Sequence, residues 1–399
     1  MSLNLDNQQT GGPSSAFALW QLGFRPFFLL GGLAAVILMV HWLLIYLGYM
    51  TAPYFANPAF WHSHELLFGY TVAVIAGFLL TAVKNWTGTP TPIHLPLMLL
   101  ALVWLAGRVV IATGDVLPPM LVLVVDVAFL PLLALAIAVP LLKARQYPNL
   151  LIFVGVLGLM TLANLLSHLD HGVVRSLTGS GIQLMVFLVM LLIAIMAGRV
   201  LPFFTETGLG GIKLKRYPWL DRLAILALLG YALVELFSLG EQASILLAGL
   251  AFLSHAARWL SWQHPGLWRV PMLWVLHLAY AWLVLSLLFG LLAHLDWVPA
   301  VVEVHAFTVG ALGMMTLGMM ARVSQGHSGR TIGASRLTVL AFVCLLLAAI
   351  VRVVGGIFAG GGYSDSIVWS ATLWLVAFVL FVIEYAPVLI KPRVDGRPG

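Results

Sequence analysis

The chain has 399 residues, of which 62% are hydrophobic and only 9% are charged, and its mean hydropathy is +1.04. A soluble domain is about half apolar and about a quarter charged, so this composition excludes a water-soluble globular protein and indicates a membrane protein with many spans. We therefore attribute the net charge of +6 to membrane topology and not to nucleic-acid binding. The single cysteine, Cys344, excludes an intramolecular disulfide and a cysteine-based zinc site.

Twelve segments are long and apolar enough to cross a bilayer as helices, which need about 20 residues each. They follow a polar stretch, residues 1–23, that contains no Lys or Arg, does not resemble a cleavable signal peptide and is predicted to be a cytoplasmic tail. The predicted fold is all-α: one twelve-helix transmembrane domain over residues 24–390, with a cytoplasmic C-terminal tail at 391–399. Its longest loop is predicted from Thr205 to Pro218. The predicted helices cover residues 27–50, 62–83, 94–113, 118–142, 150–168, 181–203, 219–239, 242–261, 269–293, 298–321, 337–359 and 366–390.

The distribution of Lys and Arg predicts the direction of this bundle. Seventeen lie on the side of the two termini, and three, Arg108, Arg175 and Arg352, lie on the other side, which together make the 20 of the chain. Because positively charged loops stay in the cytoplasm, both termini are predicted to be cytoplasmic.

Ionisable residues within the spans gather in the outer half of the bundle, remote from the termini. Such residues are costly in a bilayer and usually mark a functional site or a buried partner. A single histidine near a helix end is more often a hydrogen-bonded interfacial residue than a ligand, so the prediction of a site rests on the clustering. The outer group comprises His41, His62, His64, Glu65, Asp126, Asn164, His168, His171, Glu235, His294, Glu303 and His305.

Asn164, His168 and His171 are spaced by four and three residues and so share one helical stripe. An i, i+3 histidine pair can present two nitrogens to one ion, and imidazole suits copper. The stripe therefore predicts a metal site with His168 and His171 as ligands, unless it simply lines a cavity or faces the periplasm. Further ligands could come from His41, His62, His294 or Glu303.

The second and tenth spans share a pattern. Gly69 follows His64 by five residues, and Gly310 follows His305 by five residues. One further glycine lies 13 residues after each of the two histidines. Both spans run inward, so the two histidines are expected at equal depth, where they could bind a haem iron axially. The glycines would then admit a flat cofactor. The alternative is a packing motif with chance histidines.

Five segments, Leu19–Phe28, Trp61–Gly69, Gly198–Thr205, His305–Gly310 and Gly326–Arg330, stand out in the chain. They resemble the signature segments of the NnrS family of twelve-span bacterial inner-membrane proteins, which are associated with denitrification and nitrosative stress. The resemblance extends in order over almost the whole chain and implies haem b and copper as cofactors.

The chain also resembles, more loosely, haem–copper oxidases and nitric oxide reductases, whose haem-ligating histidines lie on helices two and ten. Their copper ligands lie on helices six and seven, which contain no histidine here. Any copper ligands must therefore come from other helices.

Two functions remain open at this stage. The first is binding, sensing or reduction of nitric oxide at a haem–copper site, with His62, His64, His168, His171, His305 and His41 as the metal-ligand candidates and quinol as a possible electron donor. Glu65 and Glu303 would carry protons or orient the imidazoles. The second is transport of a metal or metal–nitrosyl species along the same polar groups. Polar residues thin out toward the inner half, which favours the first.

Overall fold

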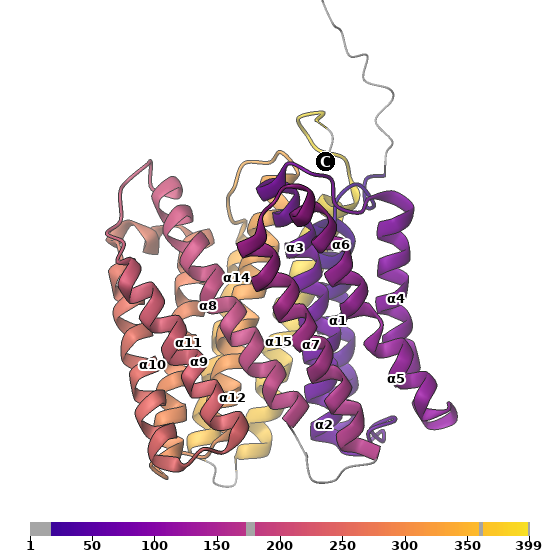
Figure 1. Ribbon diagram of the computed structural model, residues 1–399, viewed down its shortest axis with the longest axis vertical. Coiled ribbons are helices and arrows are strands. Elements are labelled where there is room, and N and C mark those ends of the chain that lie inside the picture. The colour runs from indigo at the N-terminus through magenta and orange to yellow at the C-terminus, as the bar shows by residue number, and fades with distance from the viewer. Residues whose placement is uncertain (1–16, 173–179, 359–361, 398–399) are drawn as a thin grey trace, which may run out of the picture.

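The computed structural model describes residues 17–172, 180–358 and 362–397, and all regular structure in these ranges is helical (Figure 1). The helices are α1 (Phe24–Tyr46), α2 (Pro58–His64), η1 (Glu65–Thr71), α3 (Val72–Thr87), α4 (His94–Ala112), η2 (Gly114–Val116), α5 (Pro119–Val127), α6 (Phe129–Lys143), α7 (Tyr147–Gly172), α8 (Ser180–Gly208), α9 (Pro218–Phe237), α10 (Glu241–Ser261), η4 (Pro265–Arg269), α11 (Pro271–His294), α12 (Val301–His305), η5 (Ala306–Gly313), α13 (Met314–His327), α14 (Arg336–Ile357) and α15 (Tyr363–Ile390).

The all-α prediction is confirmed, and eleven helices of the described ranges are long and apolar enough to cross a membrane. The one predicted span that is not among these eleven is the seventh, which corresponds to α9; this helix has 20 residues but carries Asp221, Arg222 and Glu235. Two of these charges have partners on α10: Arg258 Nε donates to Asp221 Oδ1 at 2.6 Å, and Ser244 Oγ donates to Glu235 Oε1 at 2.5 Å. α9 therefore packs as a helix of the bundle although its own sequence is less apolar.

Two predicted boundaries differ from the structure. The long loop predicted from Thr205 is shorter, because α8 continues through Pro202 to Gly208. The fourth predicted span is two helices, α5 and α6, which meet at Ala128.

The two ends of the described chain lie together at one end of the bundle. The amide of Ala18 donates to the carbonyl of Ile390 at 2.7 Å. The Arg25 guanidinium donates to the carbonyls of Leu389 at 3.0 Å and Lys391 at 2.7 Å, which caps the C-terminus of α15. The eleven candidate spans together with α9 make an even number of bundle helices, which returns the chain to the end at which it began.

The spans α2–η1–α3 and α12–η5–α13 form the centre of the bundle. Of their most apolar windows, 83% and 78% respectively are buried, the highest fractions among the candidate spans. The side chains of Tyr70 and Thr316 hydrogen-bond between these two spans. In each span a π-helical segment begins directly after the histidine, at Glu65 and at Ala306. The sequence repeat therefore has a structural counterpart at the same position in both spans. π-Helical turns are rare and frequently occur at functional sites.

Candidate metal centre and adjoining cavities

Two groups of side chains lie around α2, which Figure 1 places at the end of the bundle opposite the C-terminus. Pro58 occupies the first turn of α2, and the Asn57 side chain accepts a hydrogen bond from the amide of Phe60 at 3.1 Å. This cap sets where the helix begins and therefore how its histidines are directed. His62 and His64 are two residues apart, so they point to different sides of the helix.

The first group is the histidine–aspartate cluster, consisting of His64, Asp126 and His168 from α2, α5 and α7. Their side chains are fully buried. His168 Nε2 lies 3.0 Å from Asp126 Oδ2, and His64 Nε2 lies 3.4 Å from the same oxygen. One ligand atom from each residue lies within 4.8 Å of the others, so the three could hold one metal ion.

Four neighbours complete the polar surroundings of this cluster. Arg108 of α4 bonds to both Glu65 and Asp126. The Tyr54 hydroxyl lies 3.1 Å from His168 Nδ1. Asn164 Nδ2 donates to Asp126 Oδ2 at 2.9 Å, which directs Asn164 Oδ1 to His64 Nε2 at 3.0 Å.

The amide orientation of Asn164 decides the hydrogen bonding of His64. Asn164 Oδ1 can only accept, so His64 Nε2 donates to it. His64 Nδ1 meets the Glu65 carboxylate at 3.1 Å and donates there. In this arrangement both ring nitrogens of His64 carry a hydrogen. A metal ion would have to replace the hydrogen on Nε2, whereas without metal the group is a self-satisfied hydrogen-bond network.

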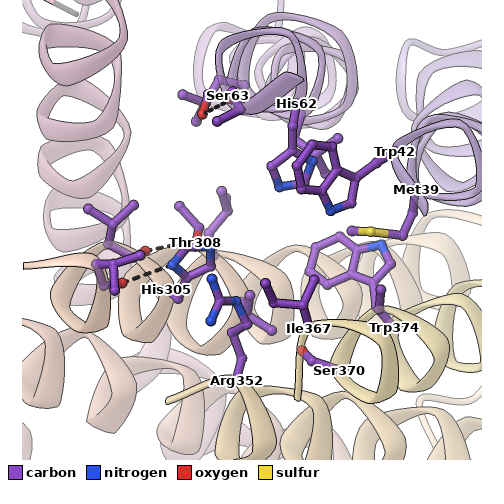
Figure 2. Close-up of a pocket in the computed structure, with 18 of the residues that line it drawn as sticks. Met39, Trp42, His62, Ser63, His305, Thr308, Arg352, Ile367, Ser370 and Trp374 are labelled. Atoms are coloured by element: carbon purple, nitrogen blue, oxygen red, sulfur yellow. Dashed lines mark hydrogen bonds between the residues drawn. The ribbon is translucent and has the colours of Figure 1, made fainter. Parts of the chain in front are cut away.

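The second group is the histidine cavity, a space of about 400 Å³ whose lining includes His62, His305 and Arg352. Figure 2 shows these three side chains directed toward a common space, with Trp42 and Trp374 on the wall beside His62. His62 stacks on Trp42 with ring centroids 4.3 Å apart. His62 Nδ1 is buried and has no hydrogen-bond partner among the described residues.

His305 is held in one tautomer. Its Nδ1 lies 2.8 Å from the carbonyl of Val301, one turn earlier, which can only accept a hydrogen bond. Nδ1 therefore carries the hydrogen, and the lone pair of Nε2 is left for another ligand.

A third feature, the glutamate cavity, adjoins the histidine cavity and has a volume of about 460 Å³. Its walls include Glu235, Glu303 and Tyr231, and it shares Ser63 and Val304 with the histidine cavity. The Tyr231 hydroxyl donates to Glu303 Oε1 at 3.1 Å, and His294 Nε2 lies 3.1 Å from Glu235 Oε1. Glu303 is therefore close to the histidine cavity but lines the neighbouring one.

The structure separates several residues that the sequence had grouped. His64 belongs to the histidine–aspartate cluster and His305 to the histidine cavity, so these two do not face one space; His62 takes the place expected for His64. Neither Gly69 nor Gly310 lines either cavity. A Cβ atom on Gly69 would meet Arg108 Nη1 at 3.1 Å, and one on Gly310 would meet Trp282 Cγ at 2.6 Å, so a protein side chain packs against each of these glycines.

The predicted ligand set around His168 also differs. His41 packs on Trp61 at 4.5 Å between ring centroids, and His294 pairs with Glu235, so neither reaches His168. The side chain of His171 lies outside the described residues. The residues that do join His168 are His64 and Asp126, which together with it could hold a metal ion.

The family match extends over nearly the whole chain. The family described as NnrS protein matches residues 18–393, which include all the segments that carried the resemblance. The chain belongs to the NnrS family. No curated protein matches the chain.

In this NnrS family member, two arginines complete the sites, and sequence reasoning used them only for topology. Arg108 pairs with both acidic groups around the histidine–aspartate cluster, Glu65 and Asp126, and Arg352 lines the histidine cavity. Both had a signal in the sequence, because they are two of the three basic residues on the side remote from the termini. An arginine on the side that the positive-inside rule disfavours is expected to have a role other than setting the topology.

Proposed function

We propose that this protein is a multi-pass metalloprotein of the bacterial inner membrane that binds or detoxifies nitric oxide at a haem b in the histidine cavity. Copper occupies the histidine–aspartate cluster, and both termini are cytoplasmic, so both sites lie in the periplasmic half. The observation that carries the proposal is that two histidines from matched central spans line one cavity.

The residues of the histidine cavity fit a haem. His305 offers the lone pair of Nε2, and His62 has a buried ring nitrogen without a partner in the described chain. Trp42 and Trp374 provide flat apolar walls. A haem there would supply an iron that binds nitric oxide and changes oxidation state. The pair that holds it is then His62 and His305, in place of His64 and His305.

The histidine–aspartate cluster fits a borderline metal such as copper. It offers two imidazoles and one carboxylate, and Tyr54 and Arg108 orient the ligands from outside. Without metal, Arg108 faces two carboxylates, those of Glu65 and Asp126, so the neutral forms of both histidines would leave one negative charge in excess. A bound cation or a proton on His64 balances that charge.

Proton and electron supply would use the surrounding groups. Glu303, hydrogen-bonded to Tyr231, lines the glutamate cavity beside the histidine cavity, which suits it to the role of a proton carrier. Glu65 is paired with Arg108 and His64, which suits it to orienting His64. Quinol remains the proposed electron donor.

Visible spectroscopy and metal analysis of the full-length protein in nanodiscs test this assignment. His62→Ala and His305→Ala should each remove or convert the haem spectrum, while His64→Ala should retain it and lower the copper content. His327→Ala is the matched control, because His327 lies at the other end of the span that contains His305. Full haem retention in both the His62 and His305 variants would refute the haem assignment.

Addition of nitric oxide to the reduced protein distinguishes the functions. A shift of the Soret band with loss of the gas indicates detoxification, and a shift alone indicates binding or sensing. A protein without visible absorption and without effect on the gas would instead favour the transporter of a metal or metal–nitrosyl species.

A further inference from the structure

Arg352 is a buried cation that has no acidic partner among the residues that the structure describes. Its side chain lies on α14, lines the histidine cavity and is only 8% exposed. Within the described part of the chain, its Nη1 has no hydrogen-bond partner and no carboxylate forms an ion pair with it. Arg108, the other described arginine of this half, is by contrast bonded to two carboxylates.

An unpaired guanidinium is costly in a medium of low dielectric constant, because the charge loses its hydration and gains nothing in return. Such a group is retained when a counter-ion occupies the space that it faces. Figure 2 shows Arg352 directed into the histidine cavity between His305 and Ile367. The counter-ion is therefore expected inside this cavity.

Tyr363 provides a second donor at the same place. Its hydroxyl accepts a hydrogen bond from Arg352 Nη2 at 3.0 Å, and the guanidinium carbon lies 5.1 Å from the centroid of its ring. Because the oxygen accepts from Arg352, the phenolic hydrogen is available to a ligand. The nearby hydroxyls of Thr308 and Ser370 already donate to the carbonyls of Val304 and Ala348.

We propose that Arg352 and Tyr363 form a binding site for a small planar oxyanion, such as nitrite or a carboxylate group, in the histidine cavity. Arg352 Nη1 and the Tyr363 hydroxyl present two donors that a pair of oxygens on one atom can satisfy together. The anion is either free or the carboxylate of a larger bound group, for example a propionate of the proposed haem. The site is formed by the chain itself, so it does not require the haem.

Equilibrium dialysis against sodium nitrite at constant ionic strength tests this site. The full-length protein in nanodiscs is used in two preparations, one made with haem supply and one without. We expect one saturable nitrite site per chain in at least the second preparation. Arg352→Gln should weaken it at least about tenfold and Tyr363→Phe by about threefold, since a hydrogen bond to an anion stabilises binding more from a cation than from a hydroxyl.

The outcomes distinguish the two sources of the anion. Nitrite bound in both preparations indicates a free anion. Nitrite bound only in the preparation without haem, together with a lower haem content of Arg352→Gln, indicates a carboxylate of the prosthetic group. Nitrite binding in the haem-free preparation does not depend on iron, so it can succeed where the haem assignment fails.

Two further variants guard against misfolding. Arg352→Lys keeps the charge but loses the forked geometry, and it should bind nitrite with intermediate affinity. Arg322→Gln is the control, because Arg322 is also buried but packs over Phe204 and does not line the cavity. Equal affinity in the wild type and Arg352→Gln, or no binding to the haem-free wild type, would overturn the proposal.

Discussion

Replacement of Asp126 by leucine should destabilise the protein strongly, because this carboxylate joins three helices. It accepts hydrogen bonds from Asn164 at 2.9 Å and from His168 at 3.0 Å, and it pairs with Arg108. The Leu side chain would leave Asn164 and His168 without this acceptor, and Arg108 would keep only one of its two carboxylates, that of Glu65.

The ion pair dominates the expected magnitude. Removing one partner of a buried pair costs about 3–5 kcal/mol. The two neutral donors add about 0.6 kcal/mol each, the average for hydrogen bonds between membrane helices. We therefore expect Asp126→Leu to lower the free energy of unfolding by about 4–6 kcal/mol.

A double-mutant cycle with Arg108→Met isolates the charge interaction. The double variant loses one positive and one negative charge, and Glu65 keeps its contact with His64. It should therefore be more stable than Asp126→Leu, with a coupling energy of about 2–3 kcal/mol. The measurement is reversible unfolding of the metal-free full-length protein in mixed detergent and SDS micelles. A loss below about 1 kcal/mol for Asp126→Leu, or strictly additive effects in the cycle, would refute the argument that this buried ion pair holds α4 and α5 together.

Two further predictions concern the ends of the helices. Reporter fusions after Gly240 and after Trp262, which flank α10, should report opposite sides of the membrane; agreement between them would contradict the span count. In the C-terminal tail, the Arg393 guanidinium lowers the pKa of Asp395 to about 2. The stabilising contact between them is thus fully present above the unfolded pKa of about 4 and is lost as the pH falls toward 2. The amide of Val394 donates to the carbonyl of Ser328, and its hydrogen exchange reports on this contact. After correction for intrinsic rates, the exchange rate should stay low at every pH above 4 and should increase below pH 4. An increase already at pH 6 would show that Asp395 is not the responsible group.

Part of the site was predictable because it depends on position along the chain. His64 and Asp126 were placed in the same half of the bundle by counting residues from the span ends, and the structure joins them in one cluster. The matched offsets after His64 and His305 indicated equivalent spans, and both spans contain a π-helical segment directly after the histidine. That His62 and not His64 lines the cavity was not predictable. Two residues of separation place the side chains on different sides of the helix but at nearly the same depth in the membrane, and only the depth was considered.

The sequence by itself determined the class of the protein, its all-α architecture, the gathering of ionisable groups in one half and the family. These properties follow from composition, apolar length and order along the chain, which do not require knowledge of neighbours. Only the tertiary structure decided which partners each polar group has. In the sequence, Arg108 and Arg352 are equivalent, because both are arginines on the side remote from the termini. In the structure, Arg108 faces Glu65 and Asp126, whereas Arg352 lines a cavity. That difference arises from the packing of α4, α5 and α14. The groups that can pair with a buried charge lie on helices distant in the chain, so only the packing decides which of them it meets.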